Sequence, residues 1–156
     1  MSRGRGTDLS RPIPARPPDA AWQKTRFSKG LSGRQARSTQ PELILRRFLR
    51  SRGIRFRLHS TVAQRLSADI VFPSKRIAVF VDGCFWHGCP QHGKDVFRGP
   101  NARLWEAKIE RNRRRDARAT ELAKASGWRV IRLWECEVKK DPVSCARRVL
   151  ALLRPS

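Results

Sequence analysis

Acidic residues are scarce in this chain. Its 156 residues include only 13 Asp and Glu against 35 Lys and Arg, which gives a formal net charge of +22. A surface field of this sign favours a polyanionic partner. DNA or RNA is the first candidate, because each phosphate contact releases condensed counterions. The alternative explanation is a GC-rich genome that encodes arginine freely, with no ligand implied.

Long apolar runs are also lacking. No run approaches the roughly 20 residues that a helix needs to span a bilayer, so we expect no membrane partner. The first residues lack the apolar segment of a secretory signal, which indicates a cytoplasmic protein. The hydrophobic fraction of 39% is enough for one globular domain with a modest core.

The start of the chain has little from which to build a core. Four of the first 18 residues are proline, the run Ser2–Gly6 is basic, and no apolar periodicity is present. We therefore predict a flexible, basic, Pro- and Arg-rich arm over residues 1–30 and a folded domain over residues 31–156. The arm either follows phosphates along a nucleic acid or has no role in binding.

Hydrophobic periodicity predicts the order helix, three strands, helix, strand, helix. The first helix begins after Thr39 as N-cap, has Pro41 in its first turn, and ends at Gly53. The strands are expected at residues 54–59, 68–72, 77–81 and 128–134, with a loop at 83–100. The later helices are expected at 101–126 and from 141 onward. This order fits a three-layer α/β domain with a central mixed sheet flanked by helices.

The chain has only four cysteines and three histidines, yet several of them have the spacing of a metal site. Cys84, Cys89 and His92 fall within nine residues on the expected loop, and Cys136 follows another expected strand. If the two strands are neighbours, three thiolates and one imidazole form a closed tetrahedral Zn²⁺ site. Such a site is structural, because no position remains for water. The alternative is cysteines that pack as small hydrophobes, which is our interpretation of Cys145.

Two carboxylates interrupt the expected buried strands. Asp69 lies inside an apolar run, and Asp82 ends the next strand. A buried carboxylate needs a partner or a cation. With Glu42 from the first helix, these two have the oxygen ligands to hold Mg²⁺, which would bridge a scissile phosphate. The alternative is that they pair with some of the 35 basic residues.

The loop also contains a histidine and two adjacent aromatic residues. His87 beside a metal centre would accept a proton from an attacking water near neutral pH; alternatively it is a zinc ligand or a surface residue. Phe85 and Trp86 cannot easily both face a small core. Exposed beside a basic surface, they would wedge between base pairs, with Trp105 joining them from the following helix. The alternative is that one of them caps the core.

Five motifs occur in order along the chain: Thr39–Glu42, the strand with Asp69, Gly83–His87, Asn112–Asp116, and Gly127–Val130 with Trp134–Cys136. Together they resemble the motifs of the very-short-patch-repair (Vsr) endonucleases. The resemblance covers roughly residues 30–140, and five motifs in this order are far more specific than any one of them.

The resemblance implies a restriction-endonuclease-like fold and Mg²⁺-dependent nicking of one DNA strand. The nick would lie 5′ to the thymine of a T:G mismatch, the product of 5-methylcytosine deamination. By position, Asp69 would be the central Mg²⁺ ligand and Glu42 would orient metal-bound water. His87 would be the general base, supported electrostatically by Asp116.

The resemblance further assigns Phe85, Trp86 and Trp105 to an intercalating wedge, and Cys84 and Cys136 to structural zinc. It implies a bacterial enzyme that works on the nucleoid. Nicking of a single strand suits a monomer, and no repair-protein partner is identified.

The chain departs from the family pattern at two places. Where the family often has Thr-His, this chain has Val81 and Asp82. Val81 can still offer its backbone carbonyl to Mg²⁺, and Asp82 would bind metal or water directly. Cys89 stands where a histidine is common, and His92 falls one residue beyond the usual cysteine, so the zinc ligands are permuted. The rival functions are a related nicking or restriction nuclease with another mismatch or modified-base preference, and a non-catalytic, zinc-stapled DNA-binding module.

Overall fold

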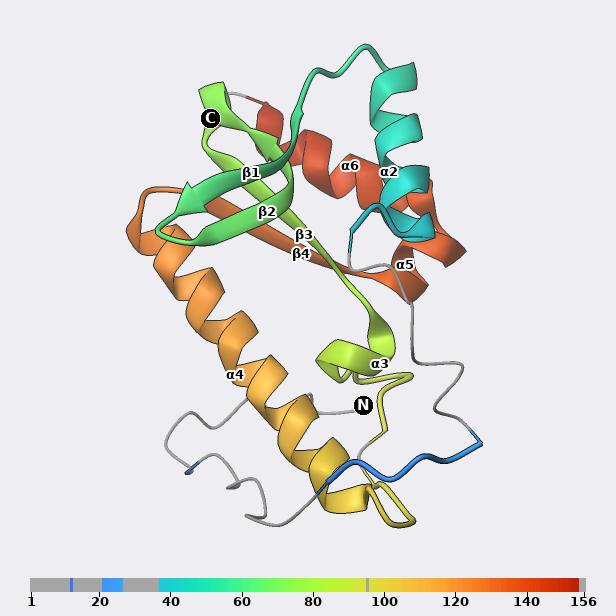
Figure 1. Cartoon of the computed structure of the whole chain (residues 1–156). Helices are drawn as coiled ribbons and strands as arrows, with labels where there is room; N and C mark the ends of the chain where they lie inside the picture. The colour runs from blue at the N-terminus through green and yellow to red at the C-terminus, as the bar shows by residue number, and fades with distance from the viewer. Residues whose placement is uncertain (1–11, 13–20, 27–36, 95, 155–156) are drawn as a thin grey trace. The chain divides into compact units, whose positions relative to one another are not determined.

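The computed structural model describes residue 12 and residues 21–26, 37–94 and 96–154 (Figure 1). Most of the expected basic arm over residues 1–30 therefore lies outside the described residues. The elements in chain order are α2 (Gln40–Ser51), β1 (Arg57–Ala63), β2 (Leu66–Phe72), the short 3₁₀ helix η1 (Pro73–Lys75), β3 (Ile77–Asp82), α3 (Cys84–His87), α4 (Ala102–Ala125), β4 (Arg129–Trp134), α5 (Glu135–Lys140) and α6 (Pro142–Leu153).

The chain divides into two compact units. We call the one formed by residues 84–117 with the start of the chain the loop unit, and the one formed by residues 36–83 and 118–156 the sheet unit. Helix α4 begins in the loop unit and ends in the sheet unit. None of the helices in the described part of the chain is both long enough and apolar enough to cross a membrane.

The sheet unit contains the predicted mixed sheet. Its four strands lie in the order β1-β2-β3-β4; the first two pairs are antiparallel and the β3–β4 pair is parallel. Along β3, β4 and the second half of β2, alternate residues enter different cores. Ile70 and Val79 lie in one cluster with residues of α2, α5 and α6, whereas Val71 and Ala78 lie in another with Ala123 near the end of α4. Helices thus cover both faces of the sheet, which confirms the predicted three layers.

Several element boundaries differ from the sequence-based expectation. Strand β1 begins at Arg57 instead of residue 54, because Ile54 and Phe56 pack against the core before the ladder with β2 starts. The expected loop over 83–100 contains the one-turn helix α3, and α5 was not predicted. Both helices are too short to show a helical period. The prediction that Cys145 belongs to the core is confirmed.

Candidate active site

Glu42 is held by the N-terminus of its own helix. Its carboxylate accepts the backbone N–H of Ser38 at 2.9 Å and of Thr39 at 3.3 Å, together with the Thr39 hydroxyl at 3.1 Å. The contact with the Thr39 N–H is one half of the capping box of α2. Arg46, one turn further on, donates from Nη2 to Oε2 at 2.6 Å. Glu42 is 2% exposed, so its charge is buried but matched, and its position is fixed.

Asp69 of β2 has a different environment. The β2–β3 ladder ends at the pair of Ile70 and Val79. Beyond this end, the backbone N–H of Val81 donates to Oδ2 of Asp69 at 2.8 Å. Burial raises the pKa of Asp69 to about 6; the Val81 hydrogen bond opposes this shift, whereas the nearby Glu42 carboxylate adds to it. A divalent cation would relieve the cost of this buried charge.

His59 of β1 joins these two carboxylates, which the sequence did not predict. Glu42, His59 and Asp69 each place one potential ligand atom within 4.8 Å of the others. Burial first, and then the Arg46 guanidinium, lower the pKa of His59 below its ordinary value of 6.5. The sheet unit therefore contains a group of oxygen and nitrogen ligands of the kind that binds a divalent metal.

Asp82 is paired with a basic residue, as the alternative interpretation expected. Arg132 of the neighbouring strand donates to both carboxylate oxygens, each at 2.7 Å. The guanidinium also stacks over the Phe80 ring at 4.6 Å and donates to the hydroxyl of Thr120 at 3.3 Å. Direct metal binding by Asp82 remains a prediction, and the metal would have to share this carboxylate with Arg132.

Two substitutions separate the roles of Asp82. Breaking a buried ion pair costs about 3–5 kcal/mol when one charge is left alone, so we expect both Asp82→Asn and Arg132→Gln to lower the stability of the zinc-loaded protein in urea unfolding without added Mn²⁺. If Asp82 binds the metal, Mn²⁺ affinity falls only in Asp82→Asn and is kept or raised in Arg132→Gln. Equal Mn²⁺ affinity in the two variants would contradict metal binding by Asp82.

In the loop unit, His87 and Asp116 form a pair. The Nδ1 atom of His87 lies 2.5 Å from Oδ2 of Asp116 on α4. The amide of Asn112, one turn earlier, donates to the Trp86 carbonyl at 2.8 Å, which fixes the end of α3 against the helix. A carboxylate on Nδ1 places the ring proton there, so Nε2 is the basic nitrogen.

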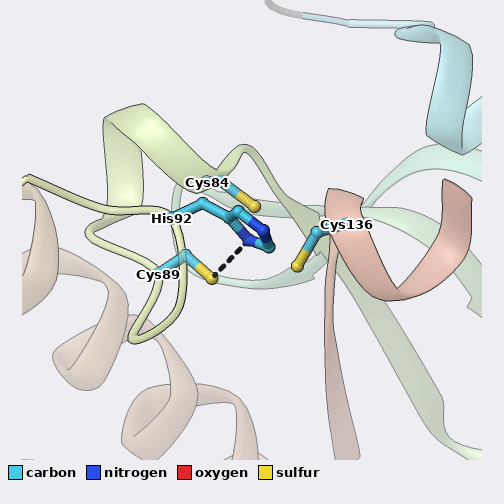
Figure 2. A group of neighbouring side chains, drawn as sticks. All are labelled: Cys84, Cys89, His92 and Cys136. Atoms are coloured by element: carbon cyan, nitrogen blue, oxygen red, sulfur yellow. Dashed lines mark hydrogen bonds between the residues drawn. The ribbon is translucent and has the colours of Figure 1, made fainter. Parts of the chain in front are cut away.

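The loop unit also contains three of the four predicted zinc ligands. Sγ of Cys89 lies 3.9 Å from Nδ1 of His92 (Figure 2). Zn–S and Zn–N bonds of about 2.3 and 2.0 Å at a tetrahedral angle give a separation of about 3.5 Å, a few tenths of an ångström shorter than the one found, so the spacing fits. The turn is tight, since a Cβ at Gly93 would meet the Cys89 carbonyl oxygen at 2.5 Å. Cys84 precedes this turn and is buried.

The surroundings of Cys89 favour the thiolate form of its side chain. Burial acts to raise its pKa, but backbone N–H groups of Gln91 and His92, with hydrogen bonds to the side chains of His92 and Cys84, outweigh burial and lower the pKa to about 7. The thiolate is the form that binds zinc.

Cys136 belongs to the sheet unit and is also labelled in Figure 2. As the zinc prediction required, β3 and β4 are neighbours, and Asp82 pairs with Trp134. Cys84 and Cys136 each stand two residues beyond that pair.

The three predicted wedge residues form one aromatic cluster in the loop unit. The ring centroids of Phe85 and Trp105 are 5.2 Å apart, and those of Trp86 and Trp105 are 5.8 Å apart. The ammonium of Lys108 lies 5.0 Å from the centroid of Trp86. Phe97 extends the cluster and stacks on Trp105 at 6.2 Å. A cation beside half-buried rings suits contact with bases and phosphates.

The described residues 21–26 of the expected arm also contribute to this cluster. Trp22 packs edge-on against Trp105, with centroids 4.8 Å apart. Asn101 clamps the next residue, since it accepts the N–H of Gln23 at 3.0 Å and donates to its carbonyl at 2.8 Å. The sequence missed Trp22 because a single aromatic residue among prolines and arginines has no periodicity.

Comparison with known proteins gives consistent matches. The family model described as DNA mismatch endonuclease Vsr matches residues 19–93. The Type II nicking enzyme V.XorIIP of Xanthomonas oryzae pv. oryzae is 44% identical over 124 residues, covering 78% of this chain and 88% of the relative. The DNA mismatch endonuclease Vsr of Escherichia coli K12 is 32% identical over 118 residues, covering 74% of this chain and 73% of the relative. Among solved structures, the catalytic domain of the homing endonuclease I-Bth0305I matches with a TM-score of 0.49 at 17% identity, over 74% of this chain and 94% of that chain.

Proposed function

The chain belongs to the Vsr family of DNA mismatch endonucleases, and from this premise we propose that it nicks DNA beside a T:G mismatch. It is a DNA-cleaving hydrolase, and relatives such as V.XorIIP are named Type II nicking enzymes. In our proposal a monomer cleaves one strand 5′ to the mismatched thymine, with Mg²⁺ as the catalytic metal. This nick would start very-short-patch repair in a bacterial cytoplasm.

The observation that carries the metal proposal is the half-buried carboxylate of Asp69, whose side chain is 23% exposed. Its pKa is raised to about 6, and it lies in a group with Glu42 and His59 in which one side-chain atom of each is within 4.8 Å of the others. We assign Asp69 to the metal, with the Val81 carbonyl as a second ligand. Glu42 orients the attacking water. Bound Mg²⁺ would neutralise charge that develops on the scissile phosphate.

His87 is the proposed general base. With Asp116 on Nδ1, the ring presents Nε2 as proton acceptor, and the carboxylate stabilises the imidazolium formed when the proton arrives. The pair is built within the loop unit from α3 and α4.

We assign Zn²⁺ to Cys84, Cys89, His92 and Cys136. The donor types are those of a closed structural site, and the Cys89–His92 spacing fits a tetrahedral ion. Zinc thus has a structural role in the proposal and takes no part in catalysis.

Phe85, Trp86 and Trp105 are the proposed wedge. Inserted rings unstack neighbouring base pairs at a cost that is lower where pairing is already weak, as at a mismatch. The clustered rings with Lys108 close by supply both stacking surface and a phosphate contact.

A strand-specific cleavage assay tests the function. The substrates are end-labelled duplexes with a central T:G pair or a matched T:A pair, in several flanking sequences, with Mg²⁺ or EDTA. We expect a Mg²⁺-dependent nick 5′ to the mismatched T, preferred over the matched duplex by at least about tenfold, which corresponds to about 1.4 kcal/mol. Equal cleavage of both duplexes would replace mismatch repair with a general nicking or restriction activity. Tight binding without cleavage in every context would favour the non-catalytic module.

A further inference from the structure

His59 lies directly across the β1–β2 hairpin from Asp69. The flanking pairs are Leu58 with Ile70 and Ser60 with Ala68, so the register sets His59 opposite the proposed metal ligand. The backbone of His59 has φ 46°, in the left-handed region that residues with a side chain seldom adopt. Departures of this kind within a strand persist where surrounding contacts require them, and they are enriched at functional sites.

The contacts of the imidazole define its tautomer. Nη2 of Arg46 lies 3.1 Å from Nε2 of His59. A guanidinium can only donate hydrogen bonds, so Nε2 is the acceptor and the proton of the neutral ring is on Nδ1. Nδ1 is the atom that faces Asp69, at 3.9 Å from Oδ1. One bridging water or a small rotation of either side chain closes this separation.

Arg46 is itself held in place from the first helix. It donates to Oε2 of Glu42 at 2.6 Å and to the hydroxyl of Ser38 at 3.1 Å. The contacts therefore run from Glu42 through Arg46 and His59 to one oxygen of Asp69. The other oxygen of Asp69 accepts the N–H of Val81 from β3. The carboxylate is thus approached from both neighbouring strands.

We propose that His59 is a positioning residue, which orients the Asp69 carboxylate for the catalytic metal by presenting Nδ1–H to Oδ1. The proposal rests on the proposed function, in which Asp69 binds Mg²⁺. A neutral donor at this place orients the oxygen without adding a positive charge that would repel the metal. Arg46 ensures that the donor is Nδ1, and Glu42 balances the charge of Arg46.

Two substitutions with the same amide group separate this role from a packing role. In His59→Asn the amide nitrogen occupies the place of Nδ1, and asparagine tolerates the left-handed backbone. In His59→Gln the amide reaches the place of Nε2, so it can accept from Arg46 but leaves Asp69 without the donor. His59→Ala removes both contacts.

The readout is the dissociation constant for Mn²⁺ of the full-length, zinc-loaded protein without DNA, measured by calorimetry. Loss of an outer-shell partner commonly weakens metal binding about 10- to 100-fold, so we expect at least tenfold weaker binding in His59→Ala and His59→Gln. His59→Asn should stay within about threefold of wild type. Thermal unfolding of the zinc-loaded variants without added Mn²⁺ checks that all three fold.

Two different results would overturn separate claims. Unchanged Mn²⁺ affinity in His59→Ala, or equal loss in the Asn and Gln variants, would remove His59 as a positioning residue. Asp69→Ala is measured in parallel: if it also leaves Mn²⁺ affinity unchanged, then the metal assignment of the proposed function fails as well. If only Asp69→Ala loses Mn²⁺, the proposed function stands and this inference alone fails.

Discussion

Asp69→Asn is expected to reduce single-turnover nicking of the T:G duplex by at least about 1000-fold, as when a group that stabilises charge in the transition state is lost. The substitution keeps the size of the side chain and removes the charge that binds Mg²⁺. Binding of the duplex in EDTA should change little, because the basic surface is unaltered. Wild-type nicking by this variant would contradict the assignment of Asp69 to the metal.

The same variant should be more stable than wild type without metal. Burial raises the pKa of Asp69 from 3.8 to about 6. The folded state therefore holds the Asp69 proton more tightly than the unfolded state does. The protonated carboxyl contributes its full stabilisation below pH 3.8, and this contribution is lost as the pH rises through about 6. The loss in the wild-type free energy of unfolding approaches about 3 kcal/mol above pH 7. Urea unfolding of the zinc-loaded protein without added Mg²⁺ should thus show Asp69→Asn gaining stability relative to wild type as the pH rises, and added Mg²⁺ should stabilise only the wild type.

Asp141→Asn is the matched control for this chemical change. Asp141 caps α6, where its carboxylate accepts the N–H of Ser144 at 2.9 Å. Asparagine is about as good an N-cap as aspartate. We therefore expect no change in nicking and little change in unfolding. A comparable loss of nicking in this control would show that the Asp69 result is not specific to the metal centre.

Loss of zinc is expected to have the second large effect. Structural Zn²⁺ contributes on the order of 10 kcal/mol in small folds that depend on it. Cys89→Ser, which removes the thiolate with the lowered pKa, should reduce the zinc content well below one ion per chain. Hydrogen exchange over residues 84–117 should then become fast, while the strands of the sheet unit stay protected. Measurements of zinc content and hydrogen exchange check both effects.

Cys145→Ser is the control for the zinc prediction. Cys145 is buried in the core of the sheet unit with Val149 and Leu133, and is outside the proposed ligand set. Serine there buries a hydroxyl, so stability falls by about 1–3 kcal/mol, but the zinc content should remain one ion per chain. If the wild type holds no zinc and EDTA leaves its exchange unchanged, the zinc assignment is wrong.

Local patterns in the sequence were sufficient for most of the secondary structure. Thr39, Pro41 and Glu42 together specify the start of α2, because a capping box needs only residues three apart. The apolar run from Ile77 likewise gave the buried strand β3. The start of β1 was misplaced, since Ile54 and Phe56 alternate as a strand does and yet have no partner in the ladder. Pairing, not alternation, decides where a strand begins.

The candidate site shows the same division. The residue types for a metal centre, Asp69 above all, could be identified because a carboxylate in an apolar run is unusual in any fold. His59 could not be identified from the sequence, because its place in the site depends on the hairpin register that sets it opposite Asp69. The sequence also left the partner of Asp82 open, and only the β3–β4 pairing supplied Arg132, 50 residues away.

The sequence alone thus determined the family, the basic surface charge and the chemistry of the ligands, because these depend on residue type and short spacing. The tertiary structure decided which charges are paired, which nitrogen of His59 carries the proton, and that Trp22 packs with Trp105. The physical reason is that a hydrogen bond or a ring contact acts over a few ångströms of space, and strand pairing and helix packing set those distances between residues far apart in the chain.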